Sequence, residues 1–152
     1  MSLVFHLSTF RRVFSIALTF LLTSSAMWAG DKAAAKTLAE IPLFAFGGIG
    51  YAGTTSNGEI AFHNVLVSEN AAADFAQILK TGTPQAQCYA LVGLRLKDRA
   101  TFDEQIKRFA SSKQEVQTCA GCMMSKQPMS SVVANIKSGT FDDRGKAGPS
   151  KR

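Results

Sequence analysis

The residues of this sequence best suited to chemistry are its three cysteines. Cys119 and Cys122 form a Cys-Ala-Gly-Cys motif, and Cys88 lies well before it in the chain. In an oxidising compartment such a set favours a disulfide, and an odd count leaves one thiol over. In the chain-entropy model a closed loop of about 35 residues contributes roughly 3.8 kcal/mol, against about 1.9 kcal/mol for the four-residue motif. The sequence therefore predicts a structural disulfide that joins Cys88 to Cys122 or Cys119.

The Cys-Ala-Gly-Cys motif also permits two other kinds of chemistry. It resembles the thioredoxin-type redox site, although the β-α-β context of that site is missing. Together with Met123, Met124 and Met129, the cysteines Cys119 and Cys122 would suit Cu(I), which prefers thiolate and thioether ligands. Covalent haem is excluded, because Met123 stands where a histidine is required. Thiol redox chemistry or copper handling at Cys119, Cys122 and Met123 is thus the alternative to a structural role.

Other catalytic constellations are weak. The predicted mature chain has one histidine, His63, and a zinc site that combines it with the three cysteines is conceivable by count alone. The acid pairs Asp103-Glu104 and Asp142-Asp143 are adjacent in sequence, whereas hydrolytic carboxylates must converge from different elements. We therefore expect no catalytic residues and no cofactor, and a protein that is not an enzyme.

A glycine-rich loop, Gly48-Ile-Gly-Tyr-Ala-Gly53, satisfies the dinucleotide-binding pattern G-x-G-x-x-G. That fingerprint needs a helix that starts at the loop, but turn-forming residues 54–58 follow instead. The loop is better explained as a tightly turned segment packed against the first helix. It is also a possible binding surface, formed by Phe46, Gly48, Gly50 and Tyr51.

The N-terminal 29 residues have the layout of a secretory signal peptide. The cations Arg11 and Arg12 precede an apolar run over residues 13–22, and small residues follow up to Ala29. The apolar run is shorter than the roughly 20 residues that a membrane span needs. We predict cleavage after Ala29 or Ala26, and hence a periplasmic or secreted protein. The general secretory route fits better than the twin-arginine route.

Charge adds little to the functional assignment. Cleavage after Ala29 leaves 15 Lys+Arg against 11 Asp+Glu, a small and scattered surplus. Residues 141–152 are expected to form a flexible basic tail, and without aromatic interleaving they do not indicate nucleic-acid binding. We expect neither a nucleic-acid partner nor a membrane partner after cleavage.

Helix signals dominate residues 56–140, which we expect to form a helical domain after an extended, glycine-rich leading segment over residues 30–55. A capping box at Ser56-Glu59 opens the first helix, and a 3.6-residue apolar period runs through residues 71–80. Thr83-Pro84 opens a third, strongly apolar helix over residues 84–97, Thr101-Glu104 opens a fourth, and Pro128 starts a last one that stops at Gly139. Gly82 suits a left-handed cap.

Five short helices with short breaks predict an all-α fold, either a compact antiparallel bundle or a short helical stack. The cadence is similar to HEAT-type α-solenoid repeats in helix length and spacing only, without their signature residues. The sequence predicts a small exported, disulfide-stabilised helical protein that acts by binding another protein of the cell envelope.

Overall fold

The computed structural model describes residues 24–148, with side chains from residue 32 onward. Contacts divide the chain into a unit that ends at Ala33 and a unit from Ala34 to Arg152. Helix α2 (Ser24–Ala39) crosses this boundary and contains both predicted cleavage points, Ala26 and Ala29. The rest of the predicted signal peptide, residues 1–23, lies outside the described residues, and export stays a prediction. None of the described helices combines the length and the apolar character that crossing a bilayer requires.

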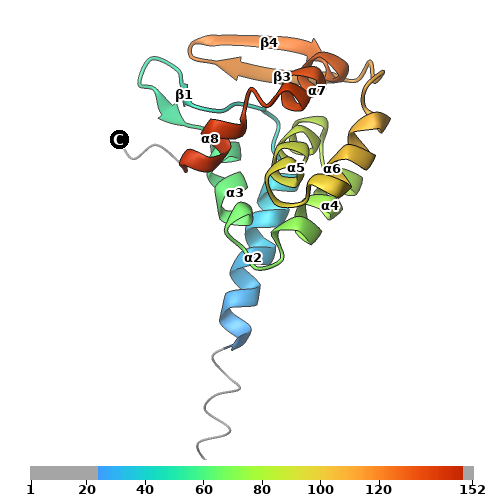
Figure 1. The fold of residues 1–152 in the computed structure, drawn as a ribbon. Helices are drawn as coiled ribbons and strands as arrows, with labels where there is room; N and C mark the ends of the chain where they lie inside the picture. Colours follow the sequence, from blue (N-terminus) through green and yellow to red (C-terminus); the bar gives the residue numbers. More distant parts are fainter. Residues whose placement is uncertain (1–23, 149–152) are drawn as a thin grey trace, which may run out of the picture. The chain divides into compact units, whose positions relative to one another are not determined.

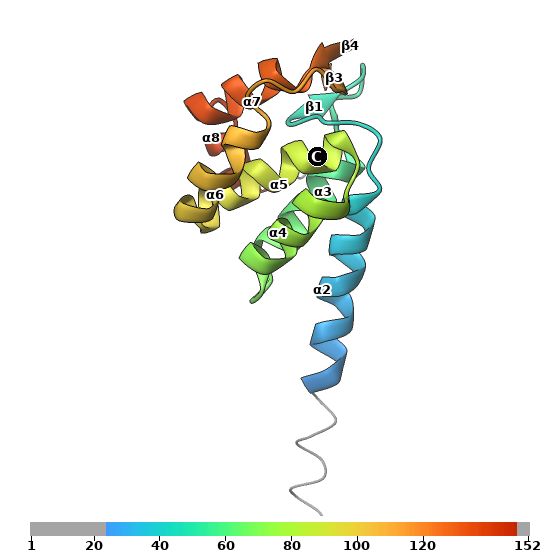
Figure 2. The ribbon, with the colours of Figure 1, turned by 90° about the vertical axis from the view of Figure 1, so that its right-hand side faces the viewer.

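The second unit contains six further α-helices, one 3-10 turn and two small antiparallel hairpins among its described residues (Figures 1 and 2). In chain order its elements after α2 are β1 (Gly48–Ile49), β2 (Thr54–Thr55), α3 (Asn57–Leu66), α4 (Ala71–Thr81), α5 (Pro84–Lys97), α6 (Arg99–Gln105), η1 (Ile106–Arg108), β3 (Glu115–Ala120), β4 (Met123–Pro128), α7 (Met129–Ser138) and α8 (Asp142–Ala147).

The all-α prediction is wrong, because the chain forms a mixed α/β fold. Residues 115–128, expected to be a short extended piece, form the β3–β4 hairpin, in which Glu115 pairs with Pro128 and Ala120 with Met123. The two-residue turn between the strands has Gly121 at a positive φ of 58°, where a side chain would be strained. The segment over residues 44–49 adds two isolated parallel bridges to this hairpin, from Phe44 to Thr118 in β3 and from Ile49 to Gly121 in the turn. A HEAT-like stack has no place for these pairings.

Local capping signals position three of the helices as the sequence predicts. The hydroxyl of Ser56 accepts the backbone N–H of Glu59 at the start of α3, and Thr83 accepts from Ala86 at the start of α5. Gly139 ends α7 in the left-handed region, with a φ of 86°.

Two of the expected caps differ. Gly82 follows α4 with extended backbone (φ −80°, ψ 167°), not with a left-handed cap. The predicted start of the fourth helix at Thr101 is also wrong, because Asp98 takes the N-cap position and its carboxylate accepts from the N–H and the hydroxyl of Thr101. Those hydrogen bonds lower the pKa of the Asp98 carboxyl.

Helix α5 is the centre of this unit. It lies among the other helices of the unit in Figure 2 and contacts α3, α4, α6, α7, α8 and β3. Its residues Cys88–Leu94 are all buried. Next to it lies an aromatic cluster in which neighbouring rings are 4.8–5.9 Å apart, a spacing typical of favourable aromatic contacts. Its members are Phe44, Phe46, Phe62, Phe75, Tyr89 and Phe141.

The hydroxyl of Tyr89 fixes the segment that leads from α2 to β1. It donates to the carbonyl oxygen of Ala45 at 2.6 Å and accepts the Ala45 N–H at 2.9 Å. The Ser56 hydroxyl also donates to Ala45 O, at 3.0 Å. Gly58 makes room for the ring, since a Cβ there would lie 2.7 Å from the Tyr89 oxygen. Three hydrogen bonds inside the core thus hold Ala45 in place.

Candidate functional site

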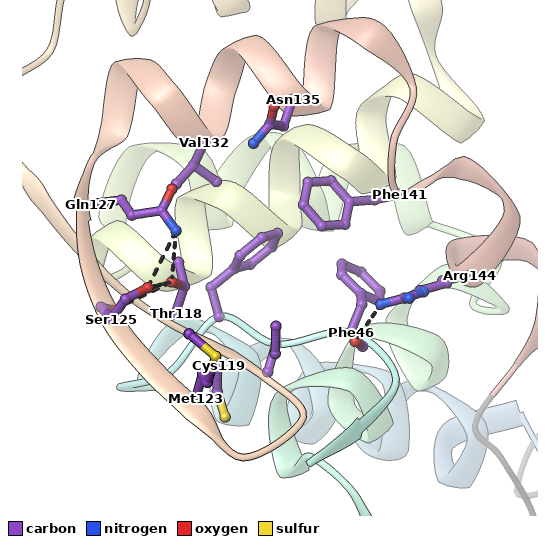
Figure 3. Close-up of a pocket in the computed structure, with 13 residues that line it drawn as sticks. Phe46, Thr118, Cys119, Met123, Ser125, Gln127, Val132, Asn135, Phe141 and Arg144 are labelled. Carbon is purple, nitrogen blue, oxygen red and sulfur yellow. Dashed lines mark hydrogen bonds between the residues drawn. The ribbon is translucent and has the colours of Figure 1, made fainter. Parts of the chain in front are cut away.

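A pocket of about 320 Å³ lies between the β3–β4 hairpin and the helices α7 and α8 (Figure 3). Its size falls at the lower end of the range for small-ligand sites, about 300–1,000 Å³. Three of its lining residues are phenylalanines, of which Phe44 and Phe46 are almost completely buried, and Arg144 is the one charged residue that lines it. The lining residues are Phe44, Ala45, Phe46, Thr118, Cys119, Ala120, Met123, Ser125, Gln127, Val132, Asn135, Phe141 and Arg144.

The hairpin supplies one wall of this pocket through its pleat. Side chains alternate between the two faces of a strand, so Thr118 and its cross-strand partner Ser125 share one face. Gln127 lies on the same face and donates to both hydroxyl groups, at 3.2 and 3.3 Å. These three side chains form hydrogen bonds with one another, and they line that end of the pocket with polar groups, as Figure 3 shows.

The opposite end depends on how α8 is held. Arg95 of α5 forms a partly buried ion pair with Asp142 at 2.8 Å and also donates to the carbonyl oxygen of Lys137. Gly145 lets α8 approach α5 closely, because a Cβ there would lie 2.8 Å from a methyl group of Leu96. These contacts place Arg144 at the pocket, where its Nη1 donates to the carbonyl oxygen of Phe46 at 2.9 Å (Figure 3).

One buried carboxyl group lies close to this arginine. Glu59, at the start of α3, is 4% exposed, and its Oε2 accepts the N–H of Gly47 at 2.9 Å. Burial raises the pKa of Glu59, while the bond from Gly47 and the charge of Arg144 act in the opposite direction. Glu59 therefore does not return a hydrogen bond to Ser56, as the predicted capping box requires, but fastens the glycine loop to α3.

Two uncharged turns meet beside the pocket. The N–H of Gly50 donates to the carbonyl oxygen of Gly121 at 2.9 Å, so the β1–β2 turn and the β3–β4 turn are joined. Exposed apolar side chains surround this joint, and Tyr51 is fully exposed. We call the end of the joined hairpins, with Tyr51, Cys122, Met123 and Met124, the tip surface; as neighbours on β4, Met123 and Met124 lie on its two opposite faces. Residues 41–58 and 116–125 contain no charged residue, so this surface has no charge of its own.

The structure separates the four residues predicted as a binding surface. Phe46 is buried and lines the pocket. Gly48 belongs to β1, Gly50 (φ 68°) forms the joint with the other turn, and Tyr51 lies on the tip surface. The turned-loop interpretation of this segment agrees with three positive φ values, at Gly47, Gly50 and Gly53.

The predicted disulfide is wrong, because all three cysteines are free. Cys88 is completely buried on the inner side of α5, whereas Cys122 is exposed in the hairpin turn and Cys119 is half-buried in β3. A disulfide needs Cα atoms within about 7 Å of each other and converging Cβ vectors, a condition that loop-entropy arguments do not test. Because Cys88 is packed inside the core, it does not pair with Cys119 or Cys122.

Thiol reactivity should follow this placement. Burial raises the pKa of Cys88 to about 12, so its thiolate is nearly absent at pH 8. We expect iodoacetamide to alkylate Cys119 and Cys122 in the native protein, and Cys88 slower by on the order of a hundredfold or more. Peptide mapping by mass spectrometry measures this, and denaturation should equalise the three sites. Equal labelling in the native state would contradict the burial of Cys88.

The redox and copper alternatives stay predictions. Neither Cys119 nor Cys122 lies at a helix N-terminus, the position that activates the thiolate of thioredoxin-type sites. The register places Met124, not Met123, directly across from Cys119, and Met129 is fully buried. His63 is buried apart from them with its Nε2 unpartnered, and burial lowers its pKa. The described residues contain no cluster of three His, Cys, Asp or Glu that could hold a metal ion.

Sequence reasoning missed most of the pocket. The sequence predicts a flexible tail at Phe141 and Arg144, whereas in the structure Phe141 packs 5.2 Å from Phe44 and Arg144 lies in helix α8. Asn135, on the exposed side of α7, had no distinguishing signal. The alternation of Val116, Thr118 and Ala120 before a glycine is the pattern that could have revealed the hairpin wall.

The described residues form a pocket and an exposed apolar tip beside it, and no converging set of catalytic groups lies among them. No family model matches this chain, and comparison with curated proteins and with solved structures gives no significant match.

Proposed function

We propose that this protein is a binding module that holds a partner protein through the tip surface and the pocket beside it. The observation that carries the proposal is the joint between Gly50 and Gly121, which gathers exposed apolar side chains from two hairpins. Met123 and Met124 are 76% and 61% exposed, and Tyr51 is fully exposed. Exposed apolar groups of this kind, grouped and uncharged, are typical of interaction surfaces.

The chemistry of the surface indicates an apolar partner. Tyrosine and methionine are enriched at protein interfaces, and methionine adapts its shape to the surface it meets. Because the tip surface carries no charge, a partner can cover it without desolvating an ion. The hydrogen bond between Gly50 and Gly121 already joins the two turns, which lowers the backbone ordering that binding would otherwise cost. We define the partner by this chemistry alone, since export remains a prediction from residues 1–29.

Site-specific photocrosslinking tests the proposal. We expect a benzophenone amino acid in place of Tyr51, in the full chain expressed in its source cells, to give a discrete protein adduct. Replacing Met123 and Met124 with serine should lower the yield by about fivefold or more, because interface anchors of this type each contribute about 1 kcal/mol or more. The double substitution should leave the thermal unfolding midpoint unchanged, since both side chains are exposed.

Val67 provides a matched control. It is apolar and 80% exposed, but it follows α3 and lies in neither of the two joined turns. The same crosslinker at position 67 should not give the adduct. An equal adduct from both positions, no adduct from position 51, or a product at twice the mass of this chain would overturn the proposal of a distinct partner.

A further inference from the structure

The pocket combines aromatic walls with one cation. Phe44, Phe46 and Phe141 have ring centroids 5.2–5.6 Å apart and form a continuous apolar surface. Arg144 is the only charged residue in the lining, and no acid lies among the residues that line the pocket. A ligand that fills this space would meet apolar surface and a positive charge together.

The guanidinium group of Arg144 has donors to spare. An arginine side chain carries five N–H donors, and a single one is used here, in the bond to Phe46 O. Among the described residues no carboxylate comes within ion-pair distance of Arg144, and the Oε2 of the neighbouring Glu59 is engaged by Gly47. Planar bidentate recognition of carboxylates is the interaction that arginine performs best.

A second polar group points into the same space. The amide of Asn135 is directed toward the pocket in Figure 3, near Phe141, and its side chain forms no hydrogen bond with another described residue. In that view the Phe141 ring lies between Asn135 and Arg144, so the amide can bind a polar atom of the ligand other than the group that Arg144 binds. The pocket volume of about 320 Å³ leaves room for one aromatic or large aliphatic group beside a carboxylate.

We propose that the pocket binds a carboxylate attached to an aromatic or large apolar group. The apolar group lies against Phe44, Phe46 and Phe141, and the carboxylate is held by Arg144. Such a ligand can be the last residue of a partner polypeptide or a free small acid, and both have the same chemistry. The polypeptide source deepens the proposed function and rests on it, whereas the free acid does not.

Titration of the full chain with three probes tests this inference. The probes are 3-phenylpropionate, an acetylated tripeptide that ends in phenylalanine with a free carboxylate, and the same tripeptide as its amide. Chemical-shift changes of backbone amides report binding and its location. We expect the free-carboxylate peptide to bind about tenfold or more tightly than the amide, because the amide cannot form the charged pair.

The two acids distinguish the sources. Tighter binding of the peptide acid than of 3-phenylpropionate indicates a C-terminal residue, and the reverse order indicates a free small acid. Equal affinity for the peptide acid and its amide, or no binding of either acid at millimolar concentration, would overturn the proposal.

Substitutions of the pocket residues test which side chains bind the acid. Arg144→Gln should weaken the binding of the acids about tenfold or more and leave the weak binding of the amide unchanged. Arg99→Gln is the control, because that arginine is exposed and pairs with Asp103 on α6. Asn135→Leu is a second variant on the exposed side of α7 that should not disturb folding, and it should weaken binding of the peptide acid by a few-fold. Unchanged affinity in both pocket variants would contradict the proposal.

The experiments distinguish failure of the pocket-ligand proposal from failure of the proposed protein-binding function. The crosslink from position 51 does not depend on Arg144, so an adduct without acid binding removes only the pocket ligand. Acid binding without an adduct removes the protein partner and leaves the small-acid source.

Discussion

Replacing Gly93 with alanine is expected to destabilise the protein by about 3 kcal/mol, although a glycine-to-alanine change inside a helix ordinarily stabilises by up to about 1 kcal/mol. Gly93 is buried in the middle of α5, and a Cβ there would lie 2.3 Å from Cε2 and 2.4 Å from Cδ2 of Phe75. Phe75 is completely buried and packs 5.5 Å from Phe62, so its ring has little freedom to move away. The overlap therefore outweighs the gain in helix propensity.

Urea unfolding followed by circular dichroism measures this change. Lys97→Ala, on the exposed last turn of α5, is the control and should change the free energy of unfolding by less than about 0.5 kcal/mol. Combining Gly93→Ala with Phe75→Leu should recover part of the loss, because the smaller side chain removes the ring atoms that the new methyl meets. Neutral or increased stability of Gly93→Ala would show that α4 and α5 do not pack as closely as described.

Replacing Tyr89 with phenylalanine should cost about 2 kcal/mol, since it leaves buried backbone groups without a partner. The hydroxyl is completely buried and accepts the Ala45 N–H while donating to the Ala45 carbonyl. Ser56 still donates to that carbonyl in the variant, so the loss falls mainly on the N–H. Because the Ala45 N–H loses this acceptor, faster amide hydrogen exchange at Ala45, which lines the pocket, should accompany the loss of stability.

The chain contains a matched control for this substitution. Tyr51 is the other tyrosine and is fully exposed, so Tyr51→Phe should leave the free energy of unfolding unchanged. A similar loss in both variants would argue against a specific role of the buried hydroxyl.

The effect of Tyr89→Phe should also depend on pH. Burial raises the pKa of Tyr89 to about 12 from its ordinary value of 10.0. The unfolded chain therefore releases this proton first, and the stability that the phenol contributes is present below pH 10 and is lost as the pH rises toward 12. The difference between the wild type and Tyr89→Phe should shrink over that interval. The stability contributed by the buried Cys88 thiol also decreases as the pH rises, and it does so in both proteins, because burial raises the pKa of Cys88 in each.

The helix signals show how much of the fold is readable from sequence. Ser56, Thr83 and Gly139 act through hydrogen bonds to residues at most four positions away, and each lies where the sequence places it. At Asp98 two capping candidates lie three residues apart, and the aspartate is preferred because its carboxylate accepts both donors of Thr101. Local competition of this kind limits where a helix starts more than whether it forms.

The candidate site was less accessible to sequence reasoning. The glycine loop and the Cys-Ala-Gly-Cys motif were both singled out, but their meeting at Gly50 and Gly121 depends on a pairing across the fold. Phe46 was identified as part of a possible surface, whereas the arginine that faces it, Arg144, was assigned to a tail. The contact between those two residues spans 98 positions.

The sequence by itself thus determined the local elements: most helix caps, the turned glycine loop and the central apolar helix α5. Tertiary structure alone decided that β3 and β4 pair, that Cys88 is enclosed by the core and forms no disulfide, and that Arg144 faces aromatic rings. The physical reason is the range of the forces involved. Caps and turns close within a few residues, while strand pairing, aromatic packing and the Arg95–Asp142 ion pair join segments whose approach depends on the whole fold.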